Sequence, residues 1–268
     1  MTPEERRAAL EAIASEVRVC GRCRLSEQRT HAVPGEGDPD TEVVFVGEGP
    51  GQNEDRQGRP FVGAAGELLE QLLGLVAWRR EEVFITNVVK CRPPGNRDPE
   101  PDEIAACRPY LERQLQVLDP ALVVSLGRHS LQTFMPGERI GQVHGTARPA
   151  SPATGARAAT AYAMYHPAAA LRQGGLMVTM QRDMAAIPDA LLRARAARDA
   201  QAAWSDPEAQ ATTGTAIVST THAAGAVPDG TATREEAGAP SISAMPPGPD
   251  LLPPPAAAPP SDDQLGLF

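Results

Sequence analysis

The amino-acid sequence predicts an α/β protein of three layers, with a central four-stranded parallel sheet between two layers of helices, followed by a C-terminal tail. Four short apolar runs begin near Val43, Val83, Leu122 and Thr160, and a helical pattern follows each of them. Strands that alternate with helices at this spacing form parallel sheets covered on both faces. After Trp204 the composition changes and the alternation stops.

Each element has its own local signal. The first helix has Pro3 near its start and Leu10, Ile13 and Val17 at helical spacing. The strands are short runs of β-branched and aliphatic residues, as is typical of buried parallel strands. The expected elements are helices over 3–19, 64–75, 102–118, 130–134 and 168–203, and strands over 42–47, 83–86, 122–126 and 160–165. We expect the last helix to break at Gly174-Gly175 and near Pro188, and residues 136–158 to be loop-rich with room for a hairpin.

The tail is expected to be disordered. Residues 205–263 are rich in Ala, Pro, Gly, Thr and Ser, and they contain no aromatic residue. Such a segment cannot bury enough apolar surface to offset the entropy of ordering it. It also carries most of the net charge of −9, because residues 1–200 hold 24 basic and 26 acidic residues.

No targeting segment is visible in the sequence. The first ten residues are charged, and no apolar run reaches the ~20 residues that a membrane helix needs. We therefore expect a cytoplasmic protein that does not enter a membrane. In that compartment, cysteines are better candidates for metal ligands than for disulfides.

A glycine-rich turn follows the first strand and predicts a ligand site. The order strand, glycine-rich turn (residues 47–51), polar loop and helix places a ligand at the carboxyl end of a parallel sheet. Glu48 inside the turn would repel a phosphate, and the Lys-Ser/Thr of a phosphate-binding loop is absent. The turn therefore predicts a neutral ligand and an acid/base or electrostatic role for Glu48, and it argues against a nucleotide-binding protein.

The four cysteines predict a metal site. Cys20 and Cys23 form a CxxC knuckle after the first helix, and Cys91 and Cys107 follow the second strand. Four thiolates at these positions satisfy either tetrahedral Zn²⁺ or a [4Fe–4S] cluster. The spacing by itself leaves both open.

Taken together, the motifs resemble those of one enzyme family. The segments GEGPGQNED, GRPFVG, ITNVVKCRPPGNRDP and YHPAAAL, in this order and with the four cysteines, resemble the family 4 (iron–sulfur type) uracil-DNA glycosylases over roughly residues 3–200. Family 5 lacks an acid where Glu48 stands. A related crosslinking group carries a nucleophilic histidine in the loop after the second strand, and residues 90–99 contain none.

The resemblance implies a function and a cofactor. It implies a catalytic domain over residues 1–204 that hydrolyses the N-glycosidic bond of uracil in DNA and so initiates base-excision repair. It favours a [4Fe–4S] cluster over zinc. Two alternatives stay open: a module that recognises uracil in DNA without turnover, and a glycosylase that accepts a wider range of deaminated bases.

The resemblance also assigns three catalytic side chains. Asn87 would accept a hydrogen bond from uracil N3–H and donate to O4, a pattern that cytosine reverses. His166 would contact uracil O2, where negative charge grows as the bond breaks. Glu48 would orient the attacking water or stabilise the cationic sugar, by analogy with glycoside hydrolysis.

Four further residues would shape the substrate pocket. Phe61 would stack on the extruded base, and Gly49 and Pro50 would line it through their backbone. Glu54 would crowd the C5 position and exclude the thymine methyl group.

The surface that meets DNA is expected near the carboxyl ends of the strands. The candidates for DNA contact are Arg92, Arg97, Arg128, Leu171 and Arg172. The protein is expected to be a monomer.

The last five residues predict a partner. Gln264, Leu265, Leu267 and Phe268 resemble the short peptide by which bacterial repair and replication proteins bind the sliding clamp that encircles DNA. Two adjacent apolar anchors would fill a pocket, and the glutamine would hydrogen-bond at its edge.

Overall fold

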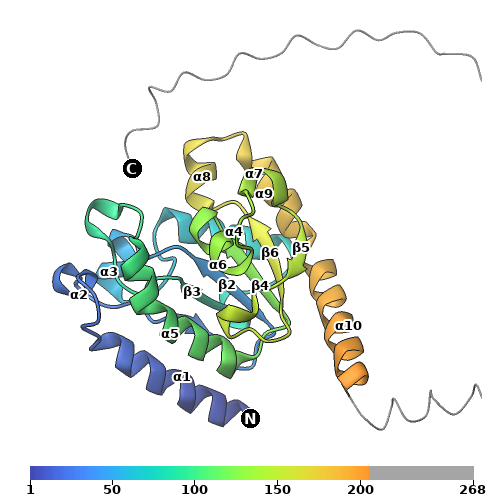
Figure 1. The fold of residues 1–268 in the computed structure, drawn as a ribbon. Helices are drawn as coiled ribbons and strands as arrows, with labels where there is room; N and C mark the ends of the chain where they lie inside the picture. Colours follow the sequence, from blue (N-terminus) through green and yellow to red (C-terminus); the bar gives the residue numbers. More distant parts are fainter. Residues whose placement is uncertain (206–268) are drawn as a thin grey trace, which may run out of the picture. The chain divides into compact units, whose positions relative to one another are not determined.

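The computed structural model describes residues 1–205 (Figure 1). The predicted linker and terminal peptide lie outside the described residues, apart from Ser205, which ends the last helix.

A mixed sheet of six strands forms the centre of the fold, in the order β1-β3-β2-β4-β6-β5. The strands are β1 (Glu36–Gly37), β2 (Val43–Gly47), β3 (Phe84–Asn87), β4 (Leu122–Leu126), β5 (Ala147–Pro149) and β6 (Thr160–Met164). The four predicted strands are confirmed and are mutually parallel. The sheet is wider than predicted, because a short antiparallel strand pairs with each edge.

The predicted helices are confirmed, and three short helices over residues 25–28, 52–57 and 140–143 were not predicted. The helices of the structure are α1 (Pro3–Arg18), α2 (Leu25–Gln28), α3 (Gln52–Gln57), α4 (Ala64–Leu75), α5 (Pro101–Leu118), α6 (Arg128–Phe134), α7 (Ile140–Val143), α8 (Pro167–Arg172), α9 (Leu176–Ala185) and α10 (Ile187–Ser205). The polar loop expected after β2 contains the short helix α3. The long last helix is three helices, broken at the two places predicted from its glycines and proline. No helix in residues 1–205 is long and apolar enough to span a membrane.

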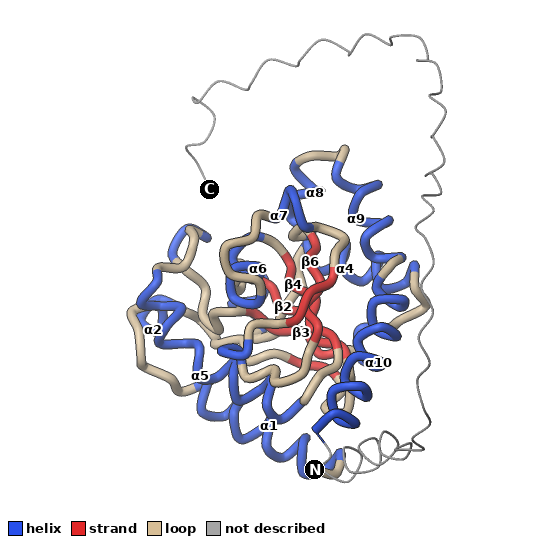
Figure 2. The backbone as a smooth tube through the Cα atoms, turned by 45° about the vertical axis from the view of Figure 1, so that its right-hand side comes forward, coloured by secondary structure: helices blue, strands red, loops and turns tan. Residues whose placement is uncertain are grey.

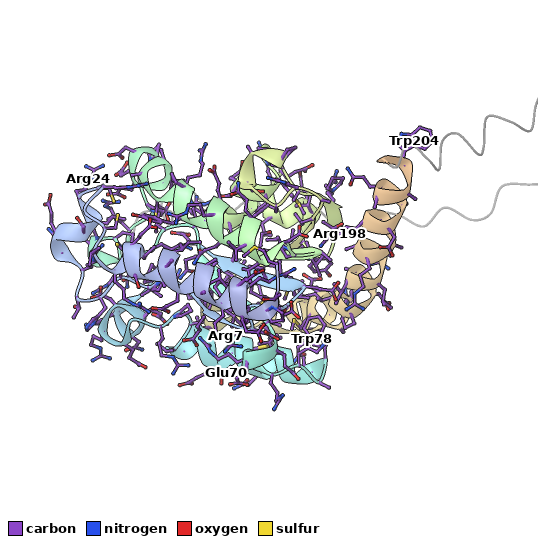
Figure 3. The ribbon with its side chains drawn as sticks, turned by 90° about the horizontal axis from the view of Figure 1, so that it is seen from below. Arg7, Arg24, Glu70, Trp78, Arg198 and Trp204 are labelled. Atoms are coloured by element: carbon purple, nitrogen blue, oxygen red, sulfur yellow. The ribbon has the colours of Figure 1, made fainter. Side chains whose placement is uncertain are left out.

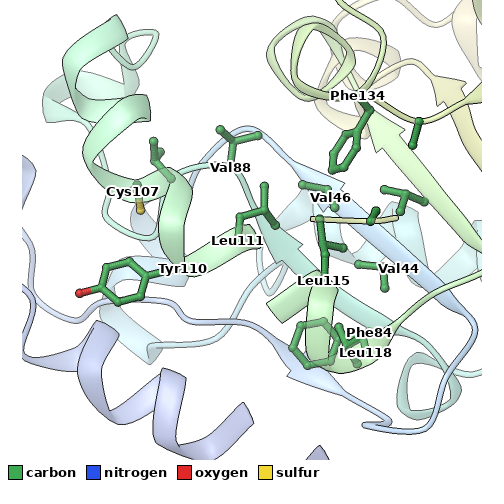
Figure 4. Close-up of a cluster of buried hydrophobic side chains, with 14 of the residues drawn as sticks. Val44, Val46, Phe84, Val88, Cys107, Tyr110, Leu111, Leu115, Leu118 and Phe134 are labelled. Atoms are coloured by element: carbon green, nitrogen blue, oxygen red, sulfur yellow. The ribbon is translucent and has the colours of Figure 1, made fainter. Parts of the chain in front are cut away.

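Alternate residues of the central strands fill two separate cores, because successive strand side chains point to opposite faces. On one face, Val44 and Val46 lie in a cluster with Leu111 and Leu115 of α5 (Figure 4). On the other face, Phe45 packs in a cluster supplied by α4, α9 and α10. The helices cover both faces of the sheet in the tube view (Figure 2), which confirms the three-layer prediction.

Helix α1 brings the CxxC knuckle to one end of the molecule. Its buried face contains the predicted Leu10, Ile13 and Val17 and packs beside α5. Arg24, just after the knuckle, and Trp204, near the end of α10, lie at opposite ends of the domain (Figure 3). The metal-site candidate is therefore attached to the sheet through α1 and α5.

Candidate active site

The carboxyl ends of the parallel strands meet at one edge and bring the predicted catalytic residues together. Gly47 at the end of β2 is paired with Asn87 at the end of β3. The Gly127 N–H after β4 donates to the Met164 carbonyl at the end of β6 (2.8 Å). Glu48 follows directly after β2, and His166 lies two residues after the end of β6. The ends of four strands therefore surround one space.

That space is a cavity of about 500 Å³. All seven residues predicted to bind the substrate line it: Glu48, Gly49, Pro50, Glu54, Phe61, Asn87 and His166. Its volume lies within the range of ordinary small-molecule pockets. The cavity can therefore hold a single base.

Gly47 makes the close packing at the cavity floor possible. A Cβ atom there would lie 2.4 Å from Asn87 Oδ1 and 2.7 Å from Phe61 Cζ. Gly127 has a similar function beside His166. Its φ is +84°, and an added Cβ atom would lie 2.9 Å from the Cβ of His166, so the backbone conformation and the close contact both require glycine. These two glycines were not predicted as site residues, although a glycine directly after a strand is a visible signal.

Phe61 is held in a strained backbone conformation. Its φ is +51°, which costs about 1–3 kcal/mol for a residue with a side chain. Arg80, itself 9% exposed, donates to the Phe61 carbonyl (2.8 Å) and to that of Pro60, and it pairs with Glu36. The ring of Phe61 is thereby fixed beside the His166 imidazole, with 5.6 Å between ring centroids.

Glu54 holds the same loop from the cavity side. Its carboxylate accepts hydrogen bonds from the N–H groups of Gly51 (3.1 Å), Val62 (2.8 Å) and Gly63 (2.9 Å). It thus links the start of α3 to the segment that follows Phe61. The predicted role at uracil C5 stays a prediction, while the structure gives Glu54 this additional one.

Asn87 has an unsatisfied acceptor. The side chain is 1% exposed, and its Oδ1 has no hydrogen-bond partner among the described residues. A buried polar atom without a partner costs roughly 1–3 kcal/mol. A ligand that donated a hydrogen bond to this atom would recover that cost.

His166 is positioned as a neutral hydrogen-bond donor. The Ala168 N–H donates to its Nδ1 (3.1 Å), so the ring proton of the neutral imidazole is on Nε2. Burial and, to a smaller extent, the charge of Arg172 lower the pKa of His166 to about 4, and Glu54 partly opposes the shift. The imidazole is therefore neutral at physiological pH.

Glu48 lies at the rim beside an unpredicted group of charges. Burial raises the pKa of Glu48, and the Asp98 carboxylate adds to the rise, whereas His129 and Arg128 oppose it. His129 Nε2 lies 3.8 Å from a Glu48 oxygen and 3.3 Å from an Asp98 oxygen. No local sequence pattern connects residues 48, 98 and 129, so sequence reasoning missed His129 and Asp98.

The DNA-contact candidates divide into two groups. Arg97 is engaged inside the protein, because both of its terminal nitrogens donate to the fully buried Glu103. Arg92 bonds to Asn96 within its own loop (2.7 Å), and Arg128 pairs with Asp98. On α8, Arg172 lines the cavity and Leu171 is 51% exposed beside it, so the end of α8 is the part of the rim most available to DNA.

Comparison with known proteins identifies the family. Residues 34–189 match the model of the uracil DNA glycosylase superfamily. The type-4 uracil-DNA glycosylase of Saccharolobus solfataricus is 45% identical over 188 residues, which cover 68% of this chain and 86% of that protein. The chain belongs to the type-4 uracil-DNA glycosylase family.

Two further relatives place the chain within the superfamily. The type-4 enzyme of Sulfurisphaera tokodaii is 60% identical over 123 residues, which span 46% of this chain and just over half (56%) of that relative. The type-5 uracil-DNA glycosylase of Thermus thermophilus is 37% identical over 118 residues, 38% of this chain and 53% of that protein. The weaker type-5 match agrees with the assignment to type 4.

The four cysteines of this type-4 family member come together, as predicted. Cys20, Cys23, Cys91 and Cys107 surround one small space between α1, α5 and the segment after β3. The Lys90 N–H donates to Cys107 Sγ (3.2 Å) and Arg29 donates to Cys91 Sγ (3.0 Å). Donors of this kind stabilise thiolate ligands.

The spacing of the sulfur atoms bears on the choice of metal. In tetrahedral zinc with bonds of ~2.3 Å, the sulfurs lie about 3.8 Å apart. Within residues 1–205, only one set of three candidate metal ligands has all of its ligand atoms within 4.8 Å of one another. That set consists of Glu48, Asp98 and His129. No three of the cysteine sulfurs in residues 1–205 form such a set, so they lie farther apart than the ligands of a bound zinc ion.

Proposed function

We propose that this protein removes uracil from DNA by hydrolysing the N-glycosidic bond, as the first step of base-excision repair. The observation that carries the proposal is the orphaned Oδ1 of Asn87 at the floor of a base-sized cavity. A neutral imidazole and a carboxylate line the same cavity.

Asn87 selects the base. Its Oδ1 accepts from the uracil N3–H, and its amide nitrogen donates to O4. Cytosine presents an acceptor at N3 and a donor at N4, so it would leave the buried amide unpaired. Sites built on such hydrogen bonds reject the wrong ligand by factors of roughly 10⁴–10⁵.

His166 stabilises the leaving group. Its Nε2–H donates to uracil O2, where negative charge develops as the bond breaks. One preorganised donor aimed at developing charge supplies roughly 2.7–4 kcal/mol. Because the Ala168 N–H donates to Nδ1, the single ring proton of the neutral imidazole is on Nε2 and is available for this bond.

Glu48 acts on the sugar side. Its carboxylate either orients the attacking water or stabilises the oxocarbenium-like sugar. The ring of Phe61 stacks on the base, the backbone of Gly49 and Pro50 lines it, and Glu54 keeps a methyl group away from C5.

The base must leave the DNA stack to reach this cavity. Leu171 and Arg172 at the end of α8 would meet the backbone and the vacated stack. Arg92 and the exposed part of Arg97, on the loop over residues 92–99, would add contacts to the backbone. The protein would act as a monomer in the cytoplasm.

The cysteine site would hold a [4Fe–4S] cluster on Cys20, Cys23, Cys91 and Cys107. When bound, such a cluster ties the end of α1 to α5 and to the segment after β3, which is a structural role. Metal and sulfide analysis of anaerobically purified protein tests this, with iron and sulfide expected. Stoichiometric zinc without sulfide contradicts it.

Gln264, Leu265, Leu267 and Phe268, which lie outside the described residues, would bind a bacterial sliding clamp. The support for this proposal is their sequence pattern alone.

A single experiment tests the enzymatic function. The purified protein is incubated with a single-uracil oligonucleotide, and alkali then cleaves abasic sites. We expect cleavage at uracil, no cleavage at thymine or cytosine, and loss of cleavage at uracil in the Glu48→Gln variant. Binding without cleavage would instead indicate a recognition module, and equal cleavage at hypoxanthine or xanthine would indicate the wider base range.

A further inference from the structure

The carboxylate of Glu48 has little support of its own. Among residues 1–205, no group donates a hydrogen bond to its oxygens, and His129 is the one basic side chain within 4.0 Å. The side chain is 30% exposed, at the rim of the cavity. A carboxylate that must face the sugar therefore depends on its neighbours for its direction and its charge.

His129 is fixed between two carboxylates. It is the second residue of α6, which begins at the glycine turn after β4, and its backbone carbonyl accepts from Thr133 Oγ1 (3.2 Å). Nε2 lies 3.3 Å from Asp98 and 3.8 Å from Glu48. The imidazole is 19% exposed, so most of the ring is covered by its neighbours.

Asp98 is itself held in place. It is the next-to-last residue of the loop over residues 92–99. Its neighbour Arg97 is bonded to the buried Glu103 and also donates to the Asp98 carbonyl (2.8 Å). Arg128 pairs with the Asp98 carboxylate and lies 3.0 Å from His129 Nε2. Two carboxylates, a guanidinium and an imidazole thus share one corner beside the cavity, and all but the imidazole line it.

We propose that His129 is a positioning residue for Glu48, and that with Asp98 it sets the charge and direction of the Glu48 carboxylate. This proposal rests on the proposed glycosylase function. When the imidazole is protonated, its charge attracts both carboxylates, and Arg128 donates its hydrogen bond to Asp98 alone. When the imidazole is neutral, Arg128 donates to Nε2 and the corner carries one net negative charge.

The electrostatic effects on Glu48 agree with this arrangement. Burial raises the pKa of Glu48, the charge of His129 lowers it, Asp98 raises it and Arg128 lowers it. The other charged or titratable groups that line the cavity are Glu54, Arg97, Tyr165, His166 and Arg172. Removing His129 and removing the Asp98 charge must therefore move the titration of Glu48 in opposite directions.

The test is the pH profile of single-turnover uracil excision by the full-length holoenzyme. His129→Gln keeps a side chain of similar size but removes the charge, and it should move the acid limb of the profile to higher pH by at least ~0.5 unit. Asp98→Asn should move that limb to lower pH. His31→Gln, on an exposed histidine that contacts neither acid, should titrate like wild type. Profiles of His129→Gln and Asp98→Asn that superimpose on that of wild type would overturn the proposal.

A second readout does not need catalysis. The carboxyl carbon of Glu48 can be titrated by ¹³C NMR and assigned by the loss of its signal in Glu48→Gln. The same opposite shifts are expected there, even if the wild-type protein leaves uracil in place. An unchanged Glu48 titration in both variants refutes the role of His129, whereas inactive wild type with shifted titrations refutes only the glycosylase function.

Discussion

Gly47→Ala should damage the site without unfolding the protein, because Gly47 has no room for a side chain. The added Cβ would lie 2.4 Å from Asn87 Oδ1 and 2.7 Å from Phe61 Cζ. Restoring a carbon–carbon separation of ~3.5 Å requires the Phe61 ring to move by about 0.8 Å. Both base-recognition groups are therefore displaced by one methyl group.

The expected loss follows from that displacement. A misplacement of about 1 Å costs on the order of 100-fold in rate, which corresponds to about 2.7 kcal/mol of transition-state stabilisation. Single-turnover excision on a uracil oligonucleotide measures it, and circular dichroism monitors folding. We expect a rate about 100-fold lower with a folded spectrum.

Gly74→Ala is the matched control. Gly74 is exposed near the end of α4, and a Cβ there meets nothing within 4 Å. Alanine is preferred over glycine in helices by up to ~1 kcal/mol, so this variant should be slightly more stable and fully active. If Gly47→Ala excised uracil as fast as Gly74→Ala, the close packing at the cavity floor would not matter for catalysis.

Four other predictions follow from the site and the sequence. His166→Ala should slow excision by about 100-fold or more and change DNA affinity little; because burial lowers the pKa of His166 to about 4, the wild-type rate should show no His166 titration down to pH ~5. Asn87→Asp should lower the ratio of uracil to cytosine excision, since a carboxylate lacks the donor for O4; an unchanged ratio contradicts the recognition model. Cys107→Ala should lose bound metal and solubility together, measured by metal analysis of the soluble fraction, because metal binding is coupled to folding; full iron content would rule out Cys107 as a ligand. Deleting residues 264–268 should leave excision on free oligonucleotides unchanged and abolish clamp binding in a fluorescence titration; retained binding would place the contact elsewhere.

The sequence by itself determined the four parallel strands and most of the helices, because buried strands and amphipathic helices leave local patterns. It also predicted that Glu48, Asn87 and His166 would lie close together, because each of them stands at the end of an apolar run or just after it. Parallel strands end at the same edge of a sheet, so these positions had to converge. The four cysteines came together because the end of α1, the segment after β3 and α5 meet in one place.

Only the tertiary structure decided which side chains support that site. β1 and β5 have two and three residues, too few to show a period, and α3 lies in a stretch that reads as polar loop. The contact of Arg80 with the Phe61 carbonyl spans 19 residues, and that of His129 with Glu48 joins residues far apart in the chain. Such contacts depend on the packing of whole helices against the sheet, so no local pattern of residues encodes them.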